Sequence, residues 1–193
     1  MGKIGTSVRR LEDPVLLKGK GKFIADLNFP DQIYMRVVRS TVAFGKIINI
    51  DTDFAKQVDG VIDVWTGEDL VKIPPIGFRM TVVPGLEPYR QRILSHKWVR
   101  YVGEPIAVVF AQNYYIAEDA AEMIYPEFEE HVPQKNATEK PNNFDEKISN
   151  HVTTLEKKYG NLDEAFSKAE NFLELDFKVG RHSGVPLETR GAL

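Results

Sequence analysis

The chain alternates between short apolar runs and polar turns, which predicts several strands and one well-defined helix. Residues 105–111 (PIAVVFA) are continuously apolar, and their length and β-branched content predict a strand buried on both faces. Asn113 then offers a helix cap. We expect the helix to end at Tyr125, because a residue before proline avoids helical backbone. Its apolar stripe has helical spacing and consists of Ala117, Ala120, Ala121 and Ile124.

Further strands are predicted on both sides of this pair of elements. Apolar and β-branched residues favour strands at 32–40, 46–50 and 61–66, and another at 127–132 after the helix. Asp51 is a candidate cap for a short helical turn that reaches Val58. The mixture of separate strands and helices predicts an α+β domain.

Residues 73–89 interrupt this pattern. They contain four prolines and two glycines, so they cannot form a central strand or the interior of a helix. We interpret them as a long surface excursion. Loops of this length in compact domains usually serve a function or lie against a partner.

A second unit follows a polar stretch. Residues 133–150 have the composition of an interdomain linker. Beyond them we expect a strand at 151–159, a helix capped by Asn161, and a half-buried strand at 173–179, where apolar and charged residues alternate. One helix and two strands are too little to form an independent core. Residues 151–193 should therefore need the first domain or another chain, and residues 173–179, if unpaired, would be an association site.

Composition narrows the classes of function. The chain has 193 residues, of which 42% are hydrophobic and 27% charged, and its net charge is −3. No general basic field exists to bind nucleic acid, and no apolar run is long enough to span a membrane. Arg9 and Arg10 precede no apolar core, which argues against an export signal. We expect a cytoplasmic protein with no nucleic-acid or membrane partner.

The chain's residues also limit its redox chemistry. It contains no cysteine, so its own thiolates hold no iron–sulfur cluster. Its four histidines are far apart in sequence and show no zinc-type spacing. No glycine-rich dinucleotide motif follows a strand. Electron carriers for any redox reaction must come from elsewhere.

Four segments resemble the molybdenum-binding large subunit of the xanthine dehydrogenase, aldehyde oxidase and carbon monoxide dehydrogenase family. The most specific is VRYVGEPIAVVFAQ at residues 99–112, together with the alanine-rich helix after it. RRLEDPVLLKGKGKFIADL at residues 9–27 resembles the start of that subunit, and residues 37–66 resemble its next strands. The family usually has histidine where this chain has Phe44, so no role is carried over there. GVPLETRGAL, the end of a weaker match at residues 181–193, resembles the entry to the cofactor domain.

The resemblance implies a specific domain organisation. Residues 9–132 would form an α/β-hammerhead domain, residues 133–150 a linker, and residues 151–193 the incomplete start of a molybdopterin-binding domain, as its first strand, helix and strand. In this family, the glycine-rich loops that hold molybdopterin and the glutamate base at the metal lie downstream of the terminal motif. We therefore expect no catalytic residue and no metal ligand in this chain. The cofactor's own dithiolene sulfurs hold the molybdenum, so the missing cysteines do not argue against the family.

A few polar residues and the tryptophans require interpretation. Glu188 and Arg190, in the terminal motif, are the candidate cofactor contacts, although a buried structural ion pair is the simpler interpretation. Glu104 is expected to close a turn by a hydrogen bond rather than act as an acid or base, and Gly103 to adopt a backbone conformation that other residues avoid. We expect His131 and His182 at the surface or at the ends of elements. Trp65 and Trp98 are expected in the core.

Two hypotheses follow for function. In the first, the chain is the N-terminal component of a molybdenum hydroxylase large subunit and a structural cover for the cofactor domain, inactive alone. Its partners would be the chain that carries the rest of the large subunit, an iron–sulfur subunit with [2Fe-2S] clusters and an FAD subunit. The substrate would be carbon monoxide, an aldehyde, a purine or another heterocycle. In the second, the same fold serves as a free-standing interaction or scaffold domain without catalysis.

Overall fold

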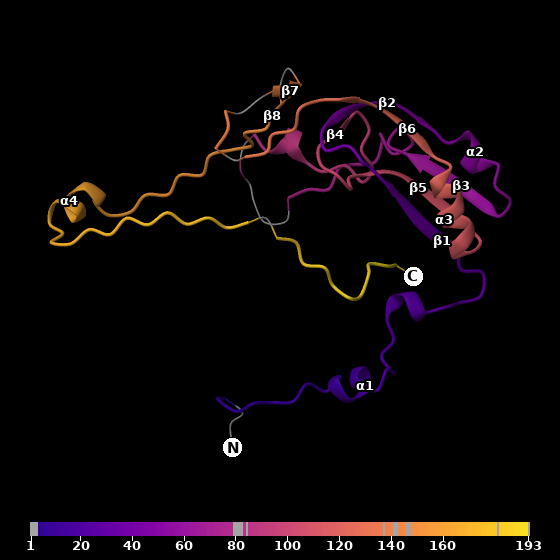
Figure 1. The fold of residues 1–193 in the computed structure, drawn as a ribbon, viewed down its shortest axis with the longest axis horizontal. Coiled ribbons are helices and arrows are strands. Elements are labelled where there is room, and N and C mark those ends of the chain that lie inside the picture. Colours follow the sequence, from indigo (N-terminus) through magenta and orange to yellow (C-terminus); the bar gives the residue numbers. More distant parts are fainter. Residues whose placement is uncertain are drawn as a thin grey trace. The chain divides into compact units, whose positions relative to one another are not determined.

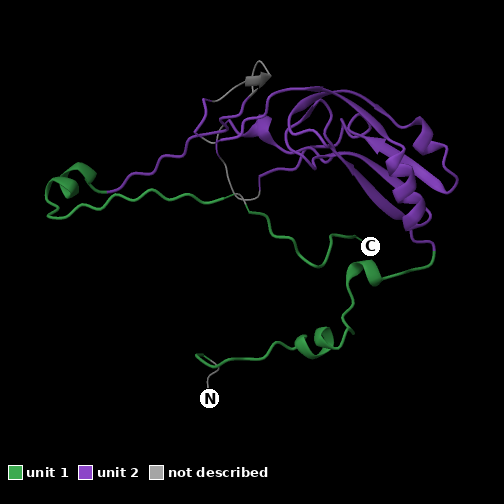
Figure 2. Ribbon diagram, viewed as in Figure 1, with its two compact units in different colours: residues 1–30, 160–193 green, residues 31–159 purple. Residues whose placement is uncertain are grey.

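The computed structural model describes residues 4–78, 83, 85–136, 138–140, 143–145, 148–180 and 182–192. The chain divides into two compact units (Figure 2). Unit 2 comprises Asp31–Tyr159, and unit 1 combines the two chain ends, Met1–Pro30 and Gly160–Leu193. Unit 2 contains both larger sheets and the buried core, so it is described first.

Three antiparallel strands form the first sheet, which we call sheet A. Its strands are β1 (Tyr34–Arg39), β5 (Pro105–Ala111) and β3 (Val61–Thr66), in the order β1-β5-β3. The run predicted as a buried strand is the central strand β5, with the predicted bounds. The strands predicted at 32–40 and 61–66 are its two neighbours. Sheet A therefore joins segments that are far apart in the sequence.

The helix α3 (Tyr114–Glu122) covers one face of sheet A (Figure 1). It begins as predicted, because the side chain of Asn113 accepts a hydrogen bond from the backbone N–H of Ile116 at 2.9 Å. The helix ends earlier than predicted, since strand β6 already begins at Tyr125. The predicted stripe packs on the sheet and forms a core with residues of α2, β3 and β5; the buried members are Ala55, Val64, Ala107, Val109, Ala120 and Ile124.

A second three-stranded antiparallel sheet, which we call sheet B, has the order β4-β2-β6. The strands predicted at 46–50 and 127–132 are its β2 and β6, each with slightly shifted bounds. The helical turn predicted after Asp51 is α2 (Asp53–Lys56), and the Asp51 side chain accepts a hydrogen bond from the N–H of Asp53 at 2.9 Å. The three strands are β4 (Trp98–Val99), β2 (Gly45–Asp51) and β6 (Tyr125–Glu130).

The proline-rich excursion at residues 73–89 follows the predicted irregular path in its described part. It contains an isolated bridge from Ile76 to Gln91 and the short 3-10 helix η2 (Glu87–Tyr89). Residues 79–82 and 84, which belong to the predicted excursion, lie outside the described residues. Beyond the excursion, the backbone N–H of Ser95 donates to the carbonyl oxygen of Pro105 at 2.8 Å. This bond ties the chain after the excursion to the start of β5.

The segment predicted as a linker contains regular structure. β7 (Asn143–Asp145) and β8 (Ile148–Ser149) pair into a two-stranded sheet within it. Residues 137, 141–142 and 146–147 of this segment lie outside the described residues. The domain limits at residues 132 and 150 remain predictions.

Beyond residue 150, the predicted helix forms but the predicted strands do not. α4 (Leu162–Ser167) begins at Asn161, whose side chain accepts a hydrogen bond from the N–H of Glu164 at 3.2 Å. The prediction of a strand at 151–159 and of another at 173–179 was wrong for these described residues, which are in no strand. A strand requires a neighbour for its backbone N–H and C=O groups, and none of the strands among the described residues pairs with either segment. The alternating apolar side chains of 173–179 are therefore exposed, Phe177 at 82%.

The remaining helical segments of unit 1 are α1 (Asp13–Leu17) and η1 (Ile24–Asp26). No helix in the described part of the chain combines the length and the apolar character that a bilayer crossing requires.

Candidate functional site

Among the described residues, Glu104 is the only charged side chain that is buried, with 1% of its surface exposed. It ends the turn of residues 100–104, which joins β4 to β5 and which we call the Arg100–Glu104 turn. The Glu104 carboxylate accepts hydrogen bonds from the Arg100 backbone N–H at 2.5 Å and from its Nε at 3.0 Å. The Nη2 of Arg100 also contacts it in an ion pair. The predicted turn-closing hydrogen bond is confirmed, and the arginine partner was missed.

The backbone of this turn is tied to the end of β1. Gly103 has a φ of 93°, which confirms the expected left-handed conformation. The N–H of Gly103 donates to the carbonyl oxygen of Ser40 at 2.8 Å. The N–H of Ser40 in turn donates to the carbonyl oxygen of Glu104 at 2.9 Å. The Nη1 of Arg39 donates to the carbonyl oxygen of Gly103 at 2.9 Å. These bonds join the turn to the end of β1, and we interpret the Arg100–Glu104 turn as a structural support.

Three rings gather at one end of sheet B. Phe44 and Trp98 stack with ring centroids 5.5 Å apart, and His131 meets the Trp98 ring edge-on at 5.2 Å. The His131 Nε2 lies 3.4 Å from a carboxylate oxygen of Glu129. Phe44 thus holds a packing position in this cluster. Sequence spacing could not reveal this cluster, because its rings come from three separate segments.

The terminal candidates Glu188 and Arg190 are both exposed. The Glu188 carboxylate accepts a hydrogen bond from the N–H of Ile24 at 3.3 Å, within unit 1. No ion pair joins Glu188 to Arg190 in the part of the chain that is described, so the buried ion pair does not exist here. Arg181 and Leu193, the ends of the motif, lie outside the described residues. A role of Glu188 and Arg190 at a cofactor stays a prediction.

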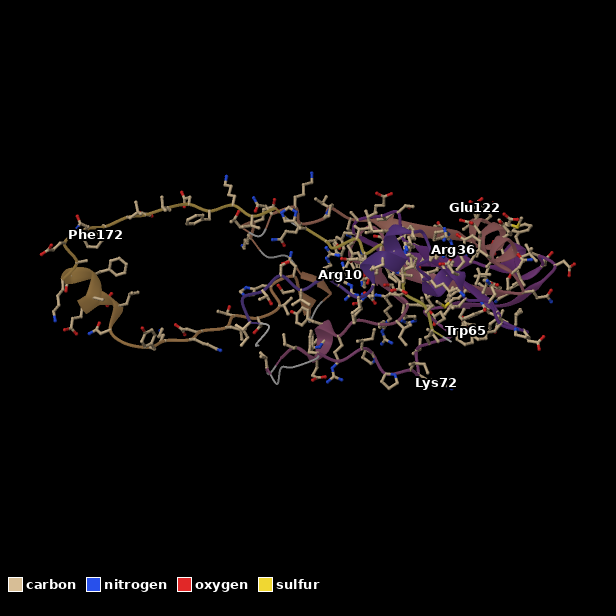
Figure 3. The ribbon with its side chains drawn as sticks, turned by 90° about the horizontal axis from the view of Figure 1, so that it is seen from below. Arg10, Arg36, Trp65, Lys72, Glu122 and Phe172 are labelled. Atoms are coloured by element: carbon tan, nitrogen blue, oxygen red, sulfur yellow. The ribbon has the colours of Figure 1, made fainter. Side chains whose placement is uncertain are left out.

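The expectation that both tryptophans anchor the core was wrong for Trp65, which is 40% exposed. Trp65 lies on β3, and its Nε1 donates to the Asp63 carboxylate at 2.6 Å. Figure 3 shows Trp65 and Glu122 of α3 on opposite sides of unit 2. The helix covers the other face of sheet A, so it cannot cover this ring. The predicted surface position of His182 is confirmed.

The described residues do not fit a molybdenum–pterin cofactor by themselves. The phosphate of such a cofactor needs N–H and cationic donors, which Arg and backbone amides supply best. The one buried charged side chain, Glu104, is anionic and already paired. No three His, Cys, Asp or Glu side chains lie together as a metal site within the described ranges. We therefore assign no chemical step to these side chains.

Comparison with known proteins identifies the fold. Residues 18–132 match the family model "Aldehyde oxidase and xanthine dehydrogenase, a/b hammerhead domain". Quinoline 2-oxidoreductase from Pseudomonas putida 86 superposes with a TM-score of 0.59 and 39% identity, over 68% of this chain and 17% of that one. The similar structure confirms the predicted hammerhead architecture.

Two curated relatives match almost the whole chain. The gamma subunit of the 6-hydroxypseudooxynicotine dehydrogenase complex from Paenarthrobacter nicotinovorans is 36% identical, over 98% of this chain and 25% of its own length. The nicotine 6-hydroxylase large subunit from the same organism is 35% identical, over 98% of this chain and 24% of its own length. The chain spans about a quarter of the length of these relatives. It belongs to the aldehyde oxidase and xanthine dehydrogenase family and carries that family's hammerhead domain.

Proposed function

We propose that this chain is part of the large subunit of a molybdenum hydroxylase, in which it covers the cofactor domain and carries no reacting group. The observation that supports the proposal most is the match of 98% of the chain to the two Paenarthrobacter subunits. When bound, the molybdenum cofactor would supply the chemistry, oxidising the substrate with oxygen taken from water. [2Fe-2S] clusters and FAD on partner subunits would carry the electrons away.

The named relatives favour one class of substrate. Two are named for nicotine and a nicotine derivative, and the solved structure is named for quinoline. Each of these compounds contains a nitrogen heteroaromatic ring. We therefore propose a nitrogen heterocycle as the substrate of the whole enzyme.

Isolation of the tagged chain from its native cells tests the function. We expect molybdenum in amounts equimolar with the chain, together with an iron–sulfur subunit and a flavin subunit. Mass spectrometry identifies the proteins, elemental analysis measures the metal, and reduction by quinoline or nicotine tests the substrate class. The tag expressed alone provides the background. Recovery of a molybdenum-free chain without any partner would leave the scaffold hypothesis as the better one.

The exposed segment at residues 173–179 provides a matched pair of variants. Phe177, on the apolar side of its alternating pattern, would pack against the rest of the cofactor domain, whereas its neighbour Lys178 would face solvent. Phe177→Ser is therefore expected to lower the molybdenum content of the purified chain by about tenfold, because it removes a large apolar contact. Lys178→Ser should leave that content unchanged. Equal molybdenum contents in both variants would contradict the role of this segment.

A further inference from the structure

The face of sheet A that α3 does not cover carries an apolar patch. Strand pairing places Met35 opposite Phe110, and both Val37 and Trp65 opposite Val108. Partners in a strand register point to the same face of a sheet, and the residues that alternate with them pack under α3. We call this group the far-face patch: Met35, Val37, Trp65, Val108 and Phe110.

Burial decreases across the far-face patch from its centre to its edges. Val108, on the central strand, is 5% exposed, whereas Trp65 is 40% and Met35 60% exposed. The Trp65 ring packs edge-on against Phe110, with centroids 4.8 Å apart. Unit 2 therefore leaves the outer part of a continuous apolar surface open to solvent. A rigid apolar patch on a sheet is typical of an interaction surface.

One charged residue shares this face, since the register places Asp63 opposite Phe110, and its carboxylate is already engaged. The Trp65 Nε1–H donates to one oxygen of the Asp63 carboxylate, at 2.6 Å. The other oxygen accepts from the N–H of Val64 at 2.8 Å. The patch thus offers a partner ring and aliphatic surface without a free N–H donor at Trp65. An apolar segment that excludes water would fit it better than a charged one.

We propose that the far-face patch binds an apolar segment from the rest of the large subunit. This proposal rests on the proposed function. The two Paenarthrobacter relatives contain about three quarters of their length beyond the part that matches this chain, so a large additional polypeptide accompanies this domain in them. The added segment would cover the exposed outer members of the patch, Met35 and Trp65, because Val108 on the central strand is already buried.

Methionine oxidation tests the proposal, with one control inside the chain. Met35 lies in the far-face patch and is 60% exposed, whereas Met123 caps the end of α3, outside the patch, and is 40% exposed. Dilute hydrogen peroxide oxidises exposed methionines to sulfoxides, which mass spectrometry quantifies at each position. In the isolated full chain we expect both to react. In the assembly purified from native cells, we expect the rate at Met35 to fall about tenfold while that at Met123 holds.

A pair of variants gives an independent measurement. Met35→Lys places a charge in the patch, and Tyr115→Lys makes the same change at a 75% exposed ring on α3. We expect the first to reduce the share of chain recovered in the assembly about tenfold and the second to leave it unchanged. Circular dichroism of each isolated chain verifies that it folds.

Three results would overturn the proposal. An oxidation rate at Met35 that is the same in the assembly as in the isolated chain would place the contact elsewhere, although partner and molybdenum still copurify. Protection of Met35 already in the isolated chain would show that no added segment is needed. Equal recovery of the two lysine variants in the assembly would show that the patch is not a contact. The proposed function fails separately, when the wild-type chain yields no partner.

Discussion

Replacing Gly67 with alanine is expected to lower the free energy of unfolding of unit 2 by about 3 kcal/mol. A Cβ at Gly67 would lie 2.2 Å from the carbonyl oxygen of Ser95 and 2.8 Å from the Cα of His96. These atoms belong to the backbone, so no side-chain rotation relieves the overlap. Ser95 is itself held by its hydrogen bond to Pro105 of β5. Urea denaturation followed by circular dichroism measures the loss.

Gly77→Ala is the matched control for this change. A Cβ at Gly77 would meet no atom within 4 Å, and this glycine does not have a positive φ. We expect its free energy of unfolding to stay within about 0.5 kcal/mol of the wild type. If Gly67→Ala is as stable as Gly77→Ala, the close approach between the end of β3 and the Ser95 backbone does not exist in solution.

The second large effect is expected at the buried carboxylate. Glu104→Ala should lower the free energy of unfolding by about 3 kcal/mol, because it removes the acceptor for the Arg100 backbone and side chain and leaves a cavity. The Arg100 side chain is 34% exposed, so water can solvate its charge once Glu104 is removed. The loss of unfolding free energy is therefore expected at the low end of the range for a broken buried ion pair. Thermal and urea unfolding of the full chain measure it.

An exposed ion pair in the same unit provides the comparison. Arg36 and Glu118 lie 3.0 Å apart, with 44% and 36% of their side chains exposed. Glu118→Ala should cost at most about 1 kcal/mol, because water already solvates both charges. Equal losses for Glu104→Ala and Glu118→Ala would mean that the Arg100–Glu104 turn does not hold the ends of β1 and β5 together.

The elements that were predicted correctly depend on local sequence. The strand at 105–111 needs only a run of apolar residues, and the helix after it only a cap at Asn113 and a stripe of alanines. The family resemblance then predicted how these elements assemble, because VRYVGEPIAVVFAQ is specific enough to identify the hammerhead domain. Propensity alone would not have produced the two interleaved sheets.

The features that were missed depend on contacts between distant segments or on the covering of a face. Trp65 was expected in the core because tryptophan usually anchors one, but α3 covers only the other face of its sheet. The arginine partner of Glu104 had a local signal, since it lies four residues earlier in the same motif. The strand expected at 173–179 has an alternating pattern of apolar and charged residues. Such a pattern indicates only that the segment could form a half-buried strand. A pairing partner decides whether the strand forms.

The interleaved order of the strands sets a condition on synthesis of the protein. Tyr34 pairs with Ala111 across sheet A, and Gly45 pairs with Glu130 across sheet B. A nascent chain that has left the ribosome only as far as residue 100 lacks the central strand of one sheet and an outer strand of the other. The backbone N–H and C=O groups at the edges of its early strands remain unpaired until the later strands emerge. Long-range strand pairing of this kind is slow. Emergence of Glu130 from the ribosome is therefore expected to be the threshold at which the domain folds, and nascent chains that expose less should be the ones that chaperones bind.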